Sequence, residues 1–252
     1  MRLCRGAIVA VGSVEYVHSP GAKDVWMFGW LWRAPPPRTE QQRQVWQALS
    51  GYPTYAPPEW NPDTKSLRDA NVEYRNYFFG TKELRLEALR AILAKFDIAL
   101  SVDDAGIVAL SAWLPKYADL FVADLDNDAV QDAYRSFSVP WSGTLGGLNP
   151  IFDLGIYYAE CLWLRRTKLK WIVTRGPERQ SSAHVISGLP GGKLFDPIHW
   201  TYFIYCMNIR SAKRRLQKRI PYADIGWHLK SDYFYRHILS NTPPGRRTRK
   251  TI

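Results

Sequence analysis

The chain has 252 residues, enough to bury the core of one large domain or of two small ones, and its 46% hydrophobic and 23% charged content is that of a globular protein. Its formal net charge of +11 is uneven, because residues 200–252 carry +10 and the first 199 residues carry only +1. Three well-separated cysteines (Cys4, Cys161 and Cys206) argue against a zinc cluster or a disulfide framework, and no run of about 18 apolar residues predicts a membrane span. We therefore expect a cytoplasmic protein without a metal ion or cofactor.

The first predicted element is a β-hairpin. The stretches GAIVAVGSVEYV and DVWMFGWLWRA are rich in β-forming residues, and the HSPGAK between them contains Ser-Pro-Gly, which favours a turn. Side chains alternate along a strand, so Trp26, Phe28, Trp30 and Trp32 share one face. We interpret that face as part of a core rather than as an exposed stacking surface, because exposed tryptophans are a liability.

Three helices are predicted next. Thr39 can cap a short helix, after which the Pro-rich and aromatic residues 51–66 predict a linker or surface loop and a weak domain boundary. Thr81 can cap an amphipathic helix, whose predicted apolar side consists of Leu84, Ala88, Leu89, Ile92, Leu93 and Phe96. Ser101 and Asp104 have the spacing of a capping box, and Pro115 is expected to end the helix that they begin.

The stretch NPIFDLGIYYAECLWLRR predicts a helix that is apolar on every side, with Asn149 as its N-cap and Pro150 at its first position. It carries two carboxylates, Asp153 and Glu160, seven residues apart and therefore on one face, with Cβ atoms about 10 Å apart. Gly155 is costly inside a helix, which indicates that another backbone packs closely against it.

Two interpretations of these carboxylates are open. In the structural one, Asp153 lies near the helix N-terminus and Glu160 pairs with Arg165, with Arg166 or with a basic group of the following helix. In the catalytic one, Asp153 or Glu160 works with a histidine such as His199 in a hydrolase. We favour the structural interpretation, because the sequence holds no metal-spaced histidine pair and no nucleophile motif.

KLKWIVTR and SAHVISGL predict two strands around the turn GPERQS, and Asp196 with Pro197 starts another helix. We expect residues 1–240 to form a single α+β domain, in which aromatic-rich helices pack on a small, mainly antiparallel sheet. Residues 241–252 are expected to be a disordered basic tail.

Two further patterns fail as ligand sites. DLDNDAVQDAYR begins like a calcium loop, but Ala129 stands where the loop needs glycine and Arg135 where it needs a bidentate glutamate. GLPGGKL is one residue short of a phosphate-binding loop and lacks the Ser or Thr that follows its lysine. Neither pattern predicts a bound ion or nucleotide.

The basic run RSAKRRLQKR is the clearest signal for an interaction. Its side chains could neutralise an acidic protein, phosphates or an anionic membrane surface, although a solvated helix end is the simpler alternative. The predicted binding residues are Arg210, Lys213, Arg214, Arg215, Lys218 and Arg219.

FDIALSVDDAGIVALSAWL, WSGTLGGLNPIFDLGIYYAE and a following LKW carry a resemblance to known sequences. Over about residues 84–205 the chain resembles uncharacterised bacterial proteins, some of which are similar to the immunity partners encoded beside polymorphic toxins. That resemblance implies a protein that neutralises a toxin by binding it, and it implies no catalytic residues. Many immunity proteins are acidic, so the basic C-terminal end departs from the pattern.

The sequence thus predicts a non-enzymatic protein-binding protein of the immunity type, with an acidic partner that would be a toxin. The alternatives are a nucleic-acid-binding protein that uses the basic C-terminal segment, and a hydrolase that uses Asp153 or Glu160.

Overall fold

The computed structural model describes residues 39–117, 120–122, 127–166, 168–175, 183–189, 192–203 and 238. The chain divides into two compact units, residues 1–36 and 37–252, and every described residue belongs to the second. The predicted N-terminal hairpin with its tryptophan stripe, the basic run from Arg210 to Arg219 and the tail at 241–252 lie outside the described residues.

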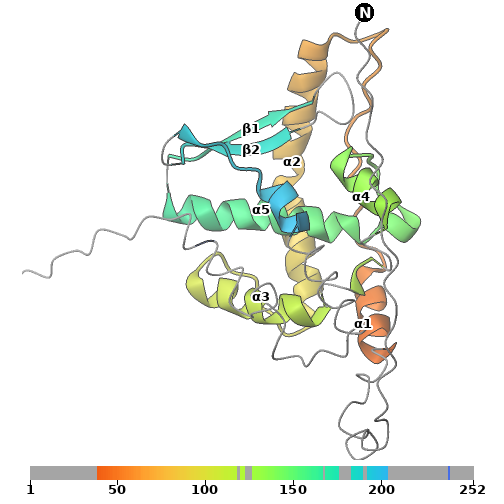
Figure 1. Cartoon of the computed structure of the whole chain (residues 1–252), viewed down its shortest axis with the longest axis vertical. Coiled ribbons are helices and arrows are strands. Elements are labelled where there is room, and N and C mark those ends of the chain that lie inside the picture. Colours follow the sequence, from red (N-terminus) through yellow and green to blue (C-terminus); the bar gives the residue numbers. More distant parts are fainter. Residues whose placement is uncertain are drawn as a thin grey trace, which may run out of the picture. The chain divides into compact units, whose positions relative to one another are not determined.

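Helices and a two-stranded sheet make up the described part (Figure 1). In chain order the elements are α1 (Thr39–Leu49), α2 (Leu67–Ala94), α3 (Asp104–Tyr117), α4 (Asp128–Arg135), the 3₁₀ helix η3 (Gly143–Leu145), α5 (Leu148–Arg165), β1 (Lys170–Thr174) and β2 (Ala183–Ser187). Residues 197–203 are also helical, as Asp196-Pro197 predicts. The predicted α+β class is confirmed, with aromatic-rich helices beside a small antiparallel sheet. No helix in the described ranges has the length and apolar character needed to cross a membrane.

The long helix α2 begins earlier than predicted, with its N-cap 15 residues before Thr81. Its N-cap is Ser66, whose hydroxyl accepts from the backbone N–H of Asp69 at 3.2 Å. Thr81 lies in the middle of α2, where its hydroxyl donates to the carbonyl of Tyr77 at 2.8 Å. The predicted capping function of Thr81 was therefore wrong, because a mid-helix threonine can form this local bond without ending the helix. Leu84, assigned to the apolar side, is 63% exposed.

The predicted ends of α3 are also corrected. Asp103 rather than Ser101 caps the helix, since its Oδ1 accepts from the N–H of Gly106 at 2.9 Å. Pro115 does not end α3, which continues to Tyr117. The extra turn is stabilised by aromatic packing, because the Tyr117 ring stacks on Trp113 with centroids 5.1 Å apart.

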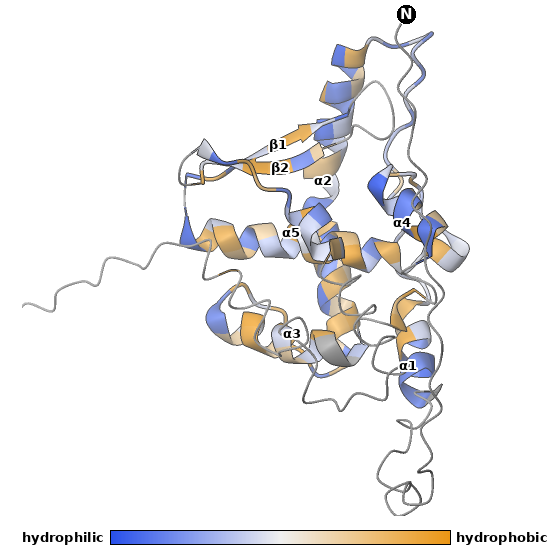
Figure 2. Ribbon diagram, viewed as in Figure 1, coloured by the Kyte–Doolittle hydropathy of each residue, from blue (hydrophilic) through white to orange (hydrophobic). Residues whose placement is uncertain are grey.

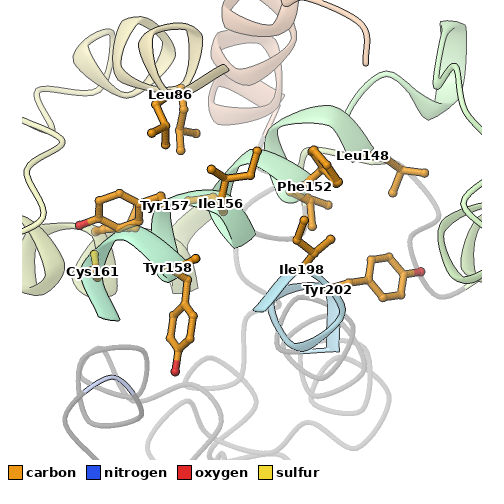
Figure 3. Packing of buried hydrophobic residues seen from close by; sticks show 14 of the residues in the cluster. Leu86, Leu148, Phe152, Ile156, Tyr157, Tyr158, Cys161, Ile198 and Tyr202 are labelled. Atoms are coloured by element: carbon orange, nitrogen blue, oxygen red, sulfur yellow. The ribbon is translucent and has the colours of Figure 1, made fainter. Parts of the chain in front are cut away.

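Helix α5 is buried on all sides from Leu148 to Leu162, as its sequence predicts, whereas Leu164 in its last turn is exposed. Figure 3 shows its side chains radiating in several directions, with Leu86 of α2 facing Ile156 and with Ile198 lying beside Phe152. Gly155 permits the contact with the helix at 197–203. A Cβ atom added at Gly155 would lie 2.6 Å from the Cα of Ile198, which confirms the predicted close approach of another backbone.

Asn149 is not the N-cap of α5, because the helix starts one residue earlier, at Leu148. The Asn149 side chain faces away from its own helix. It accepts from the backbone N–H of Tyr55 at 2.7 Å and donates to the carbonyl of Trp141 at 2.9 Å. An asparagine that precedes a proline satisfies the sequence pattern of a cap, yet here its amide holds two loops against the core.

Residues 51–66 are irregular except for one turn, as the prolines predict, but they lie inside the second unit. Tyr55 is fully buried, and its ring lies 4.5 Å from that of Phe152 of α5. The loop therefore contributes to the core that surrounds α5.

Strands β1 and β2 form the predicted antiparallel hairpin, with Val173 opposite His184 and Trp171 opposite Ile186. These four side chains share the face that packs on α2, where the ring centroids of Trp171 and Phe78 lie 5.3 Å apart. Figure 2 shows hydrophobic residues on both strands of the hairpin.

Candidate functional site

Asp153 lies at the centre of a buried polar cluster. Its carboxylate has no exposed surface, and its Oδ1 accepts from Nε of Arg85 at 2.8 Å. Oδ2 accepts from the hydroxyl of Tyr52 at 2.6 Å. The Arg85 guanidinium also donates to the carbonyl of Pro53 at 2.6 Å and lies over the rings of Tyr52 and Tyr55. This cluster joins α2, α5 and the 51–66 loop.

Burial raises the pKa of Asp153 from its usual range to about 6, although the charge and hydrogen bond of Arg85 and the hydroxyl of Tyr52 act to lower it. The carboxylate is still ionised at pH 7, where it balances the charge of Arg85. Both oxygens of this buried carboxylate are therefore bonded inside the fold, as the structural interpretation expects.

Glu160 makes the second ion pair between α5 and α2. Its Oε1 lies 2.7 Å from Nζ of Lys82, whose side chain is 17% exposed against 23% for that of Glu160. The predicted partners were wrong: Arg165 instead bonds to Asp104 and to the carbonyl of Val102 at the start of α3. The reason is that Glu160 faces α2, whereas the last turn of α5 faces α3.

His199 is not brought to either carboxylate by any hydrogen bond or ion pair among the described residues. Its backbone N–H donates to Oδ1 of Asp196 at 2.8 Å, which caps the helix at 197–203, and its side chain is exposed. The predicted hydrolase set of Asp153, Glu160 and His199 thus consists of two internal ion pairs and a separate surface histidine.

Arg85 and Lys82 were missed because the predicted apolar side of α2 included only apolar residues, although Arg85 is buried and Leu84 is exposed. Arg85 occupies a buried row of α2 with Phe78 and Leu89. An arginine in such a row is the sequence signal of a buried ion pair, since a buried guanidinium must find a carboxylate.

His184 is a second buried polar group that the sequence did not single out. Its Nε2 lies 2.7 Å from the hydroxyl of Tyr74, which accepts from the hydroxyl of Tyr55 at 3.4 Å. The rings of Phe78, Phe137 and Phe152 lie around its imidazole, with centroids 5.0–5.4 Å away. Burial lowers the pKa of His184 to about 3, so the imidazole is neutral.

Beside this network lies a small pocket of about 150 Å³. Its walls come from the 51–66 loop, from α2, from the turn after α4 and from the end of β1. The lining residues are Ala56, Pro57, Glu59, Tyr74, Phe137, Val139, Pro140 and Arg175. Phe137 has a left-handed backbone (φ 52°) at the end of α4, a conformation that favours glycine. The ring is kept there by its packing against Tyr55, Tyr74 and Trp141.

The first half of α2 presents a row of exposed side chains, which we name the outer strip: Arg68, Val72, Arg75 and Phe79. Their spacing of four, three and four residues places them on one helix face. Val72 is 48% exposed and Phe79 is 43% exposed. No ion pair within the described ranges engages either arginine, whereas Glu73 on the neighbouring side pairs with Lys65.

Within the described residues, no group of three His, Cys, Asp or Glu side chains is placed to hold a metal ion. The only cysteine described, Cys161, is a buried free thiol whose pKa burial raises to about 12. A thiol in that state is a poor nucleophile.

No protein-family model, curated protein or solved structure matches this chain.

Proposed function

We propose that this chain is a non-enzymatic protein-binding protein whose partner presents an acidic, partly apolar surface. The observation that carries the proposal is the outer strip of α2, where two arginines that form no ion pair with a described residue alternate with two exposed apolar side chains. Arginines beside apolar side chains are typical of protein interfaces. Burial of the apolar groups favours association, and the arginines attract an acidic partner and bind specific groups on it.

The chemistry of the carboxylates supports the same proposal. Asp153 and Glu160, which the hydrolase alternative needs, are both neutralised by cations of α2. The basic residues Arg210 to Arg219 add positive charge to the chain and suit the same acidic partner. A toxin neutralised by binding, as in immunity proteins, is the partner class that we propose from the sequence resemblance.

The test is direct binding to the product of the neighbouring reading frame, measured by isothermal titration calorimetry. We expect a Kd of about 1 μM or tighter. Reversing both arginines of the strip, Arg68→Glu with Arg75→Glu, should weaken binding by about tenfold or more. Arg90→Glu changes the same kind of charge on an exposed position at the other end of α2 and should leave the affinity unchanged.

The apolar half of the strip is tested in the same assay. Phe79→Ala should weaken binding by about fivefold or more, because an interface anchor loses its buried ring. Leu84→Ala is the control, since Leu84 is also apolar and exposed on α2 (63%, against 43% for Phe79) but lies outside the strip. Equal effects of the two substitutions, or no effect of the arginine reversal, would contradict an interface on this face.

The nucleic-acid alternative makes a different prediction. Fluorescence anisotropy with random duplex DNA would then show binding that weakens steeply with salt, that is lost on charge reversal at Arg214 and Lys218, and that is indifferent to Phe79→Ala. Such a pattern would replace the proposed function.

A further inference from the structure

We infer that the pocket beside Tyr74 is a binding site for a small zwitterion with a ring-sized apolar side chain, that is, a free amino acid of the phenylalanine class. This inference is independent of the proposed protein-binding function, because the pocket and the outer strip share no residue.

The size of the pocket sets the size of the apolar group. A cavity of about 150 Å³ is known to hold a single six-membered ring when its walls are apolar. Phe137, Val139 and Pro140 supply such walls from the turn after α4. An aromatic or aliphatic group is favoured there, because the walls offer it contacts that water cannot make.

One carboxylate-binding group lines the same pocket. Arg175 is held in place by its backbone N–H, which donates to Oδ1 of Asn71 at 2.6 Å, and by Nη1, which donates to the carbonyl of Pro58. The Tyr74 ring lies beneath its guanidinium, 5.8 Å from the ring centroid to Cζ.

These contacts leave Nε and Nη2 of Arg175 without an acceptor among the described residues. Nε–H and Nη2–H project from one edge of a guanidinium and match the two oxygens of a carboxylate. A guanidinium that is anchored on its other side loses little conformational entropy when such a ligand binds. The free edge therefore suits an α-carboxylate.

Glu59 supplies the opposite charge. It is exposed, it lines the pocket, and no ion pair with a described residue engages it. A plain aromatic acid would meet the repulsion of Glu59, and a plain amine would meet that of Arg175. A molecule that carries both an ammonium and a carboxylate satisfies both groups, which is why the lining selects an amino acid over either single-charge analogue.

Calorimetric titration of L-phenylalanine into the full chain tests the inference. We expect one saturable site with a Kd of about 1 mM or tighter. The analogues 3-phenylpropionate, which lacks the ammonium, and 2-phenylethylamine, which lacks the carboxylate, should each bind at least about tenfold more weakly. No heat of binding at about 20 mM ligand would overturn the inference.

Two substitutions test which residue binds the ammonium and which binds the carboxylate of the ligand. Glu59→Gln should weaken the binding of L-phenylalanine by about tenfold while leaving the binding of 3-phenylpropionate unchanged or tighter. Arg175→Gln should weaken the binding of both ligands. Glu59 is exposed, so its substitution leaves the fold intact even if Arg175→Gln destabilises the chain, and Arg90→Gln is the control outside the pocket. If Glu59→Gln leaves the affinity for L-phenylalanine unchanged, the pocket does not recognise the ammonium group. The inference of a zwitterion site would then be wrong, and the pocket would be a site for carboxylic acids only.

Discussion

Arg85 and Asp153 lie 2.8 Å apart across the contact between α2 and α5, and neither side chain is more than 5% exposed. Both are charged and both are surrounded by aromatic residues. Their pairing is a requirement of the fold, because either group alone would be a buried charge without a partner. Nη2 of Arg85 has no hydrogen-bond partner among the described residues, so Asp153 is the only anion of that part of the chain that pairs with the guanidinium.

Removing one member of this pair should be costly. We expect Asp153→Ala to lower the free energy of unfolding by about 3–5 kcal/mol, because Arg85 is left buried and unpaired. The double substitution Arg85→Met with Asp153→Leu should recover most of that loss, since neither charge then remains. Urea unfolding followed by circular dichroism measures both values. A loss below about 1 kcal/mol for Asp153→Ala would show that the carboxylate is solvated.

Glu160 and Lys82 should behave differently, because both keep access to water. We expect Glu160→Gln to cost about 0–1 kcal/mol of unfolding free energy. The same urea experiment, repeated at high salt, should narrow the difference from wild type, since screening weakens a partly exposed pair. An effect as large as that of Asp153→Ala would contradict this ranking.

His184 should make the protein sensitive to acid. Its folded pKa of about 3 lies below the ordinary histidine value of 6.5, so the unfolded chain takes up a proton that the folded chain refuses. The stability due to the neutral imidazole is complete above about pH 6.5 and is lost as the pH falls towards 3, by up to about 1.4 kcal/mol per pH unit. The raised pKa of Asp153 acts in the opposite direction between about pH 6 and 4 and masks part of this slope.

The variant His184→Gln separates the two effects. We expect the difference in unfolding free energy between wild type and His184→Gln to shrink by about 1 kcal/mol per pH unit below pH 6. The measurement is a series of urea unfolding curves between about pH 7 and pH 4. Parallel pH profiles for the two proteins would show that His184 titrates normally.

Gly155 and Gly80 offer a matched pair of helical glycines. Gly155→Ala should destabilise the protein by about 2–3 kcal/mol, because its Cβ would meet the Cα of Ile198 at 2.6 Å. Gly80→Ala should instead stabilise it by up to about 1 kcal/mol, since nothing lies within 4 Å of that Cβ and alanine is the better helix former. Thermal unfolding should therefore move in opposite directions for the two variants, and a rise for Gly155→Ala would refute the close packing.

The sequence predicted the features that depend on local pattern. The hairpin of β1 and β2 followed from β-branched runs around a Gly-Pro turn, and the buried α5 followed from its all-round apolar character. Gly155 was also interpreted correctly, because a glycine inside such a helix has few uses besides close packing. Each of these expectations rests on the residue pattern of the segment itself, even where the partner that it implies, such as Ile198 for Gly155, lies far along the chain.

The predictions that failed concern contacts with residues distant in the chain and helix ends that were placed at the wrong residue. Nothing near Asn149 in the chain indicates that its amide bonds to Tyr55, 94 residues away. Thr81 and Pro115 are residue types that often lie at helix ends. In the structure α2 continues through Thr81, which bonds to the carbonyl of Tyr77, and α3 continues past Pro115 to Tyr117, whose ring stacks on Trp113. The pocket could not be predicted for the same reason as the Asn149 contact, since Glu59 and Arg175 line it from segments that are distant in the chain.

The two ion pairs between α2 and α5 also determine how far one helix can slide along the other. Their anions are seven residues apart on α5, while their cations, Lys82 and Arg85, are three residues apart on α2. A slip of one turn, about 5.4 Å, would separate both pairs at once and leave Asp153 among aromatic rings. Apolar contacts alone would tolerate several such offsets. The four charged side chains therefore favour one alignment of α2 along α5.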